Sequence, residues 1–403
     1  MILIAATILY LVGFLAILQG VGSLLQGAAF LRFVRRELAA TPPAYAPPAS
    51  VLLPCKGLDP RLTQTLERVT RQDYPSAYEV LCAVESPTDA AVPAIQAVAA
   101  RSPVPVKCVV ASVSHECSQK IVNLLAALET LDPASQVLAF LDSDAVPHSH
   151  WLASIVAPLS DERVGVVTGY RWYDPGGGWV CLTRCVWNAM TLTLLGDHHY
   201  NFVWGGSVGI RRETFEKLGI ATRWRRVLSE DYEVTRTVRA AGLEIRFAPR
   251  CVIPNHDLAT WSQFWTFARR QLIITRVCHR TVWTMGAIMN IVFNMAFWGL
   301  LWLAVTAIAC GARGLGYAAI AGLAVIYGLA VAKSVVRQAA VALLVEPSHR
   351  SRATYWGDVL GPPLIGVLNF ALMVASGVSS RFWWRGVRYE MRAIDSVRVI
   401  DRT

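Results

Sequence analysis

The first 31 residues contain no charged side chain, and this run ends at the basic segment Arg32-Phe33-Val34-Arg35-Arg36. The run is too long for the core of a signal peptide, and about 20 apolar residues are enough to span a bilayer. Residues 1–31 are therefore predicted to form a transmembrane helix. Because positive charges prefer the cytoplasmic side of a membrane, we expect the chain that follows in the cytoplasm.

The composition supports a membrane protein with one water-exposed domain. Charged residues make up 16% of the chain, against about a quarter in a soluble globular domain. Together with a mean hydropathy of +0.41, this excludes a disordered chain, a collagen-like chain and an ordinary cytosolic enzyme. The net charge of +10 is not gathered into long basic runs, so no nucleic-acid partner is expected. The arginines lie beside apolar segments, where they either contact anionic lipid headgroups or only set the topology.

A proline-rich linker over residues 32–49 leads into a region, residues 50–257, where strand-like and helical patterns alternate. The short apolar stretches predicted as strands are 51–53, 79–84, 104–110, 137–141 and 165–167. The amphipathic stretches predicted as helices are 62–70, 91–100 and 120–131. This alternation predicts an α/β domain with a mainly parallel sheet. Ligands of such domains bind at the carboxyl ends of the strands.

The rest of the chain returns to the membrane. Residues 258–281, rich in tryptophan, phenylalanine and arginine, are predicted to form amphipathic helix in the membrane interface. Residues 282–380 are predicted to hold the C-terminal transmembrane helices, and Pro362-Pro363 interrupts the last candidate span. A basic tail, residues 381–403, follows. Three later spans would put this tail outside, against the positive-inside rule, so the last apolar segment is re-entrant or the rule is broken.

The acidic motifs carry the chemistry. Asp142-Ser143-Asp144 follows the predicted strand 137–141. Two carboxylates one residue apart can both approach a hard cation such as Mg²⁺ or Mn²⁺, which also binds substrate phosphates. Glu230-Asp231 comes after the glycine-rich segment 204–207, and Glu85 and Asp89 follow the predicted strand 79–84. All of these groups follow strand-like or loop segments, so they are expected at one edge of the sheet.

In their order and spacing, these motifs resemble the inverting glycosyltransferases of the ceramide glucosyltransferase family, including bacterial enzymes that glycosylate lipids or hopanoids. The matching segments are Leu53-Pro54-Cys55-Lys56-Gly57-Leu58-Asp59-Pro60, the acidic turn 85–89, Lys120-Ile121-Val122-Asn123-Leu124, Asp142-Ser143-Asp144, Gly205-Gly206-Ser207, Ser229-Glu230-Asp231-Tyr232 and Trp384-Arg385-Gly386-Val387-Arg388-Tyr389. The resemblance covers residues 50–280. It implies an α/β nucleotide-sugar-binding domain of the GT-A (Rossmann-like) type with transmembrane helices at both ends.

The resemblance also implies an activity, that of a hexosyltransferase. Such an enzyme would move a sugar from a UDP-sugar, UDP-glucose or a related hexose, to the hydroxyl of ceramide, diacylglycerol or a hopanoid. Asp231 would be the general base, with its neighbour Glu230 raising its pKa. Asp142 and Asp144 would hold Mg²⁺ or Mn²⁺ on the diphosphate. The residues implied to bind the donor are Pro54, Lys56, Glu85, Asp89, Lys120, Asp142 and Arg270.

One motif departs from the family pattern, and the role of one histidine stays open. The family's Gln/Arg-x-x-Arg-Trp motif corresponds here to Phe267-Ala268-Arg269-Arg270-Gln271, in which only the arginine is kept, at Arg270. That arginine is expected to clamp the diphosphate. His256 follows a strand and is either a metal ligand or a structural histidine.

The protein is expected in the inner membrane of a bacterium, with its catalytic domain in the cytoplasm. Two other transferases are alternatives. One is a processive polysaccharide synthase, which shares the catalytic carboxylates, and the other acts on a polyprenyl phosphate, whose acceptor oxygen is already ionised and needs no base. The non-enzymatic alternative is a membrane receptor or scaffold that only binds nucleotide sugars.

Overall fold

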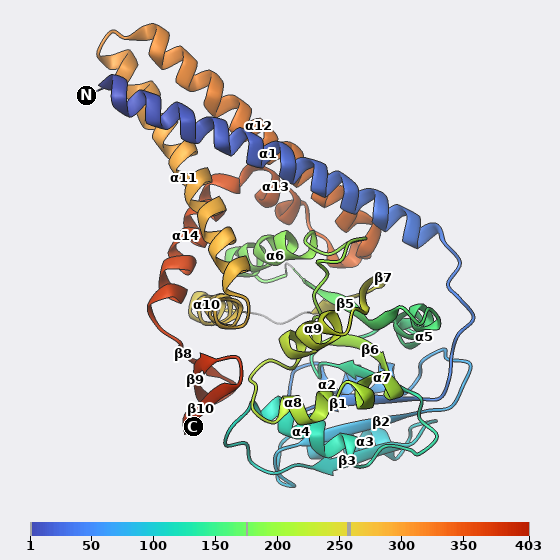
Figure 1. Cartoon of the computed structure of the whole chain (residues 1–403). Coiled ribbons are helices and arrows are strands. Elements are labelled where there is room, and N and C mark those ends of the chain that lie inside the picture. Colours follow the sequence, from blue (N-terminus) through green and yellow to red (C-terminus); the bar gives the residue numbers. More distant parts are fainter. Residues whose placement is uncertain (1, 175, 256–258, 403) are drawn as a thin grey trace. The chain divides into compact units, whose positions relative to one another are not determined.

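The computed structural model describes residues 2–174, 176–255 and 259–402 (Figure 1). The chain forms two compact units. The helical unit comprises Met1–Arg32, Pro175–Thr193 and Ala259–Ser380. The α/β unit comprises Phe33–Asp174, Leu194–Leu258 and Arg381–Thr403. Each unit therefore contains segments that are far apart in the sequence.

A seven-stranded sheet forms the centre of the α/β unit, with the strand order β3-β2-β1-β4-β6-β5-β7. The strands are β1 (Ala49–Pro54), β2 (Tyr78–Val84), β3 (Val106–Val110), β4 (Val137–Leu141), β5 (Val164–Tyr173), β6 (Ser207–Arg211) and β7 (Glu244–Asn255). Strands β3, β2, β1 and β4 are parallel, as are β5 and β7, whereas β6 runs antiparallel to its neighbours β4 and β5. The prediction of a mixed α/β fold with a mainly parallel sheet is confirmed.

Helices cover both faces of this sheet. They are α2 (Leu62–Val69), α3 (Val92–Ala99), α4 (Gln119–Leu128), α5 (Trp151–Val156), the 3₁₀ helix η1 (Ala157–Ser160), α7 (Arg212–Lys217), α8 (Ile220–Trp224) and α9 (Glu230–Ala240). Strand β1 is buried on both sides: Val51 and Leu53 face the core shared with α2, α3 and α5, and Leu52 faces the core shared with α4, α8 and α9. This period of two explains why β1 is an unbroken apolar run.

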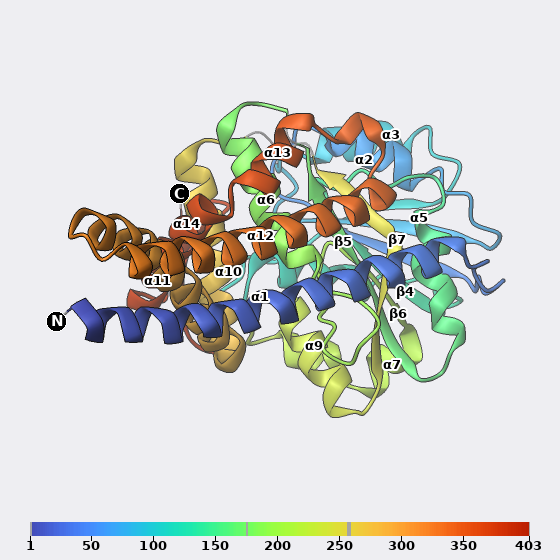
Figure 2. The ribbon, with the colours of Figure 1, turned by 90° about the horizontal axis from the view of Figure 1, so that it is seen from above.

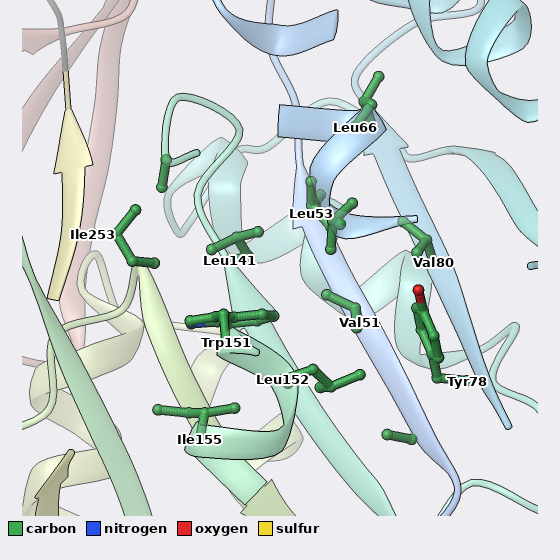
Figure 3. Close-up of a cluster of buried hydrophobic side chains, with 14 of the residues drawn as sticks. Val51, Leu53, Leu66, Tyr78, Val80, Leu141, Trp151, Leu152, Ile155 and Ile253 are labelled. Carbon is green, nitrogen blue, oxygen red and sulfur yellow. The ribbon is translucent and has the colours of Figure 1, made fainter. Parts of the chain in front are cut away.

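Figure 3 shows the first of these cores, in which Val51, Leu53 and Leu141 lie near Trp151 and Leu152. Trp151 is fully buried, and its Nε1–H donates to the Ser207 hydroxyl at 2.9 Å. Full burial of such large side chains, with the indole N–H satisfied, gives the sheet a rigid centre. The loops at the strand ends are therefore anchored to well-packed strands.

Residues 381–402 form a small antiparallel sheet, not an irregular tail. Its strands are β8 (Arg381–Trp384), β9 (Val387–Ala393) and β10 (Ser396–Arg402), in the order β10-β9-β8. The sheet belongs to the α/β unit. The Tyr389 hydroxyl accepts a hydrogen bond from the backbone N–H of Gln119 at 3.3 Å, and Arg402 forms an ion pair with Glu85 at 2.7 Å. The C-terminus is thus attached to the loops that follow β2 and β3.

The helical unit contains α1 (Ile2–Ala39) as far as Arg32, because the end of this helix belongs to the α/β unit. Its other helices are α6 (Trp179–Leu192), α10 (Trp261–Cys278), α11 (Arg280–Ala309), α12 (Arg313–Leu344), the 3₁₀ helix η2 (Pro347–His349), α13 (Arg352–Leu360) and α14 (Pro362–Val378). Both views show α1 and α12 running alongside each other, and α11 packs against α12 (Figures 1 and 2). Glycines let them approach closely: a Cβ at Gly20 would lie 3.0 Å from Leu329.

Among the described residues, α1, α11 and α12 are long and apolar enough to cross a membrane. The pair α13 and α14 is bent by 77° and forms either a broken span or a re-entrant loop. Membrane-length helices at both ends of the chain are therefore confirmed. Helix α1 is longer than predicted, because it continues past Leu31 to Ala39. The break before α14 lies at Gly361, next to Pro362, which lacks a backbone N–H and cannot continue a helix from its preceding turn.

One other segment differs from the expectation drawn from sequence. Residues 175–193, within the predicted catalytic region 50–257, belong to the helical unit and contain α6. Helix α10 begins with a capping box between Thr260 and Gln263 and exposes Trp261 and Trp265. Phe264 is instead buried in a cluster with Ala268 and Leu372, so this phenylalanine packs on protein.

Candidate functional site

The sheet topology brings the acidic motifs to one edge. Because β1, β2 and β4 are parallel, the segments that follow them, from Lys56, Glu85 and Asp142, leave the sheet at the same end. Strand β6 is antiparallel, and Leu141 pairs with Ser207, so residues 204–206 enter the sheet where β4 leaves it. This is the edge at which open α/β sheets bind their ligands.

Lys120 lies at the centre of the site. It follows the N-cap Ser118 of α4, and its ammonium group contacts two carboxylates from other elements. The Lys120 Nζ lies 2.7 Å from Asp142 Oδ1 and 2.5 Å from Glu230 Oε1. It also donates to the carbonyl oxygen of Gly205 at 3.3 Å. One cation therefore joins the loop after β4, the start of α9 and the glycine-rich segment.

The ion pairs of Lys120 offset the free-energy cost of burying charged side chains. Burial disfavours the charged forms, yet Lys120 holds the pKa of Asp142 below its ordinary value, and the two carboxylates raise the pKa of Lys120. Glu230 behaves differently. Burial raises the pKa of Glu230 to about 6, with Lys120 acting against the shift and the charge of Asp231 adding to it.

The glycines of segment 204–206 are required by close approach. A Cβ at Gly205 would lie 2.2 Å from Glu230 Oε1, and a Cβ at Gly206 would lie 2.5 Å from Asp142 Oδ2 and 2.3 Å from the Trp204 ring. These distances are shorter than van der Waals contact. Only residues without a side chain allow the backbone to pass between the carboxylates, which explains the Gly205-Gly206 pair.

Asp231, the predicted base, stands at the first turn of α9. Its Oδ1 accepts hydrogen bonds from the Ser229 hydroxyl and from the backbone N–H of Tyr232, the latter at 2.8 Å. Among the described residues, its Oδ2 accepts one long hydrogen bond, from the backbone N–H of Gly205 at 3.4 Å. The carboxylate is therefore held in one orientation, and Oδ2 is the oxygen with more capacity for a further hydrogen bond.

Asp144 lies in a second cluster with Asp59 and Arg385. The Ser143 hydroxyl donates to Asp59 Oδ2 at 2.5 Å, and Arg385 NH1 donates to the same oxygen at 3.2 Å. Arg385 NH2 lies 3.9 Å from Asp144 Oδ2. Burial and the negative charge of Asp142 raise the pKa of Asp144, while Arg385 acts in the opposite direction. We call Asp59, Asp142, Asp144, Glu230 and Asp231 the acidic cluster.

Arg171 adds another cation beside the cluster. It projects from β5, and its guanidinium carbon lies 5.0 Å from the Tyr173 ring centroid and 5.5 Å from that of Trp204. Such cation–π contacts keep an arginine fixed while leaving it charged. Its charge acts on Asp142 and Asp144.

The predicted donor-binding residues after β1 and β2 also meet. Lys56 forms an ion pair with Glu85 at 2.8 Å, and Arg402 binds the other carboxylate oxygen of Glu85 at 2.7 Å. Asp89 accepts hydrogen bonds from the backbone N–H groups of Gly57, at 3.0 Å, and Ala91, at 2.8 Å. Asp89 therefore ties the two loops together. Pro54 ends β1 beside these residues.

Two further residues were predicted at the site, Arg270 and His256. Arg270 belongs to the helical unit, where its guanidinium carbon lies 5.6 Å from the Phe267 ring centroid. Its role as a diphosphate clamp stays a prediction. His256, the possible metal ligand, lies outside the described residues.

The acidic cluster fits a divalent cation that is bound together with phosphate. Among the described residues, no three His, Cys, Asp or Glu side chains converge into a complete metal site. Mg²⁺ and similar ions usually take one or two carboxylates and complete their shell with water and substrate phosphates. Asp142 and Asp144 offer such a pair, and a third of the Asp144 side chain is exposed.

Sequence reasoning assigned no role to Asp59, Arg171 or Arg385. Asp59 and Arg385 lie inside segments that carry the family resemblance, 53–60 and 384–389, but nothing in the sequence indicates that these segments meet. The pair Arg385-Gly386 is not one of the residue pairs that indicate a two-residue hairpin, so this turn has no strong local signal. Arg171 lies within an apolar strand and has no local signal.

The arrangement is that of an α/β enzyme that handles an anionic ligand at the carboxyl edge of its sheet. Residues 10–397 match the family model of glycosyl transferase family 21, and the chain belongs to this family. The recognition of the ceramide glucosyltransferase family from the motifs is confirmed, and the chain is a glycosyltransferase.

Similar solved structures are also glycosyltransferases. A mannosyltransferase from Pyrobaculum calidifontis, solved with GDP-mannose and Mn²⁺, is 18% identical, with 92% of this chain and 98% of that chain covered and a TM-score of 0.49. Glucosyl-3-phosphoglycerate synthase from Mycobacterium tuberculosis, in complex with phosphoglyceric acid, is 16% identical, with 60% and 81% covered and a TM-score of 0.37.

Proposed function

We propose that this protein transfers a hexose from a UDP-sugar to the hydroxyl of a membrane lipid, with inversion at the anomeric carbon. The observation that carries the proposal is the orientation of Asp231. Backbone and hydroxyl donors fix its carboxylate beside the glycine-rich segment that contacts Asp142. A base in an inverting transfer must be held in this way, close to the phosphate-binding carboxylates but not bound to them.

In the proposed reaction, the acceptor hydroxyl oxygen attacks the anomeric carbon from the face opposite the diphosphate. The bond between the anomeric carbon and the diphosphate oxygen breaks, and its electron pair leaves with the nucleoside diphosphate. Asp231 accepts the hydroxyl proton, and its Oδ2 is the oxygen better placed for this because Oδ1 is already bound twice. Positioned general bases contribute about 10²–10⁴-fold to such rates.

Asp142 and Asp144 are proposed to hold the divalent cation. When bound, Mg²⁺ or Mn²⁺ would supply Lewis-acid stabilisation of the charge on the departing diphosphate. Lys120 keeps Asp142 ionised and orients it, because its ammonium group is 2.7 Å from Oδ1. Glu230 acts through the same ammonium group, so its proposed part is to position Lys120.

The C-terminal sheet supports a specific membrane topology. Helix α1 is proposed to bring the chain into the cytoplasm, and α11 and α12 to cross out and back. Since residues 381–402 belong to the α/β unit, α13 and α14 must then begin and end on the cytoplasmic face. We therefore propose that the bent pair is re-entrant. This removes the conflict between three C-terminal spans and the positive-inside rule.

The test of the function is transfer by purified full-length protein in nanodiscs. Labelled UDP-glucose, UDP-galactose and UDP-N-acetylglucosamine would each be offered with ceramide, diacylglycerol and a hopanoid acceptor, with Mn²⁺ or with excess chelator. We expect one labelled lipid product, and none in chelator. Failure to label any lipid, with every donor and acceptor, would refute the lipid transferase.

Two variants separate the proposed roles. Asp231→Asn should keep UDP-sugar binding and lose at least about 100-fold in transfer, because only proton acceptance is removed. Asp144→Ala should lose the metal-dependent part of donor binding. Asp73→Asn is the matched control, because Asp73 is largely exposed in the loop before β2. Undiminished transfer by Asp231→Asn would instead favour an acceptor that is already ionised, such as a polyprenyl phosphate.

A further inference from the structure

The turn between β8 and β9 has an unusual residue in it. Trp384 pairs with Val387, so the hairpin loop has two residues, Arg385 and Gly386, with φ angles of 46° and 74°. Positive φ at both positions is typical of a type I′ turn, which favours Asn-Gly. Among the described residues, Arg385 is the one non-glycine residue with positive φ. A left-handed arginine costs about 1–2 kcal/mol, and such local strain is found most often at functional sites.

This turn places the Arg385 side chain at the acidic cluster. Arg385 NH1 donates to Asp59 Oδ2 and to the carbonyl oxygen of Lys56, both at 3.2 Å. Asp59 Oδ2 is also bound by the Ser143 hydroxyl, from within Asp142-Ser143-Asp144. Asp59 therefore joins the arginine of the C-terminal sheet to the segment that carries the proposed metal ligands.

One side of the guanidinium keeps its hydrogen-bonding capacity. Within the part of the chain that the structure describes, NH1 makes both hydrogen bonds of Arg385, and NH2 is 3.9 Å from Asp144 Oδ2, too far for a hydrogen bond. The Arg385 side chain is 38% exposed. A guanidinium with two free donors in a fixed fork matches the oxygens of a phosphate group.

The charge balance of the acidic cluster favours a further cation beside a bound diphosphate. Within the described ranges, the five carboxylates of the acidic cluster are accompanied by three cations, those of Lys120, Arg171 and Arg385. A bound divalent cation would balance this local charge, and a diphosphate would make it negative again. Lys120 is fully engaged between two carboxylates. Arg385 is half-exposed beside Asp144, where a metal-bound diphosphate would lie.

We propose that Arg385 binds the diphosphate of the nucleotide-sugar donor, and that Asp59 is the residue that positions its guanidinium. The C-terminal sheet is thereby part of the donor site. This inference rests on the proposed function, since it assumes a nucleoside diphosphate at the acidic cluster. The alternative is that Arg385 has only a structural role, holding the C-terminal sheet against the rest of the α/β unit.

One variant of Arg385 separates diphosphate binding from a purely structural role in holding the C-terminal sheet. Arg385→Asn creates the residue pair preferred in a type I′ turn, so the hairpin should be at least as stable as before. The sheet would also keep its other attachments, including the Tyr389 hydrogen bond to Gln119 and the Arg402 ion pair with Glu85. Arg398→Ala is the control, because Arg398 is an exposed arginine on β10 of the same sheet.

The experiment measures the affinities of full-length protein for UDP and for UMP, in detergent with Mn²⁺, by titration calorimetry, together with the unfolding temperature. We expect Arg385→Asn to keep or raise the unfolding temperature and to weaken UDP binding by about 10- to 100-fold, the loss of a hydrogen bond to a charged group. UMP binding should fall much less. Arg385→Lys should lie between the two, and Arg398→Ala should match the wild type.

Asp59→Asn tests the positioning role. It should lower the ratio of UDP to UMP affinity less than Arg385→Asn does, and the double variant should be no weaker than Arg385→Asn alone, because Asp59 acts through the arginine. An unchanged ratio in Arg385→Asn would overturn the proposal. An equal loss of UDP and UMP affinity, together with a lower unfolding temperature, would also overturn it, because this is the result expected of a residue with a purely structural role. If the wild type binds neither UDP nor UMP, the proposed function itself is wrong.

Discussion

Replacing Lys120 by methionine should destabilise the α/β unit strongly. The change keeps the length of the side chain and removes the cation that lies 2.7 Å from Asp142 and 2.5 Å from Glu230. Breaking a buried ion pair costs about 3–5 kcal/mol, because the remaining charge is left without compensation. The Glu230 side chain is only 9% exposed and cannot be rehydrated, whereas that of Asp142 is 24% exposed. We therefore expect the lower end, about 3 kcal/mol.

For a domain of roughly 200 residues, 1 kcal/mol corresponds to about 2–4 °C, so the unfolding temperature should fall by about 6–12 °C. The assay is thermal unfolding of the full-length protein in detergent, followed by intrinsic tryptophan fluorescence. Lys217→Met is the matched control, since Lys217 is exposed at the end of α7. The double variant Lys120→Met/Glu230→Gln should recover part of the loss, because it removes the less hydrated of the two charges.

The loss should also depend on pH. In the wild type, Glu230 has a pKa of about 6, above its ordinary value, so protonation of this carboxyl favours the folded state and that contribution is lost as the pH rises through about 6. Without Lys120, the carboxylates take up protons more readily still. The difference between Lys120→Met and wild type should therefore be smaller at pH 5 than at pH 8. A fall no larger than that of Lys217→Met, or no dependence on pH, would refute this account of the site.

Two further predictions follow from geometry. Gly206→Ala should lower donor affinity at least about 10-fold and the free energy of unfolding by about 1–3 kcal/mol. The reason is that the new Cβ would lie 2.5 Å from Asp142 Oδ2 and 2.3 Å from the Trp204 ring. Wild-type UDP affinity in this variant would show that the space around Gly206 is wider than in the structure. If α13 and α14 are re-entrant, a reporter fused to the C-terminus should be cytoplasmic, as should one inserted in the linker before β1, and a periplasmic C-terminal reporter would contradict the topology.

Several elements could be predicted from the sequence because their signals are local. The apolar runs that became β1, β2, β4 and β5 are buried on both faces of the sheet, whereas the edge strand β3 is only partly buried. Helices α2, α3 and α4 have one apolar face each. The uncharged run at the N-terminus and the apolar segments after residue 280 formed helices of membrane length. The strands β6 and β7 were not predicted, and the reversed direction of β6 is set by its neighbours β4 and β5, not by its own residues.

The motifs also indicated which carboxylates lie together, because parallel strands end at one edge of a sheet. They could not indicate the cations. Lys120 was predicted only as a donor-binding residue implied by the family resemblance, and its contact with Asp142 and Glu230 needed the loop after β4 and the start of α9 to converge. Arg171 is a single basic residue in an apolar strand, and only the fold places it beside Trp204 and the acidic cluster.

By itself, the sequence determined the fold class, the membrane-length helices and the family, since each depends on hydrophobic periodicity or on motifs of a few adjacent residues. Only the tertiary structure decided that residues 381–402 form a sheet within the α/β unit and that Arg385 meets Asp59, 326 residues away in the chain. The physical reason is that a contact between distant segments is set by how the whole core packs, and no local pattern in either segment encodes its partner.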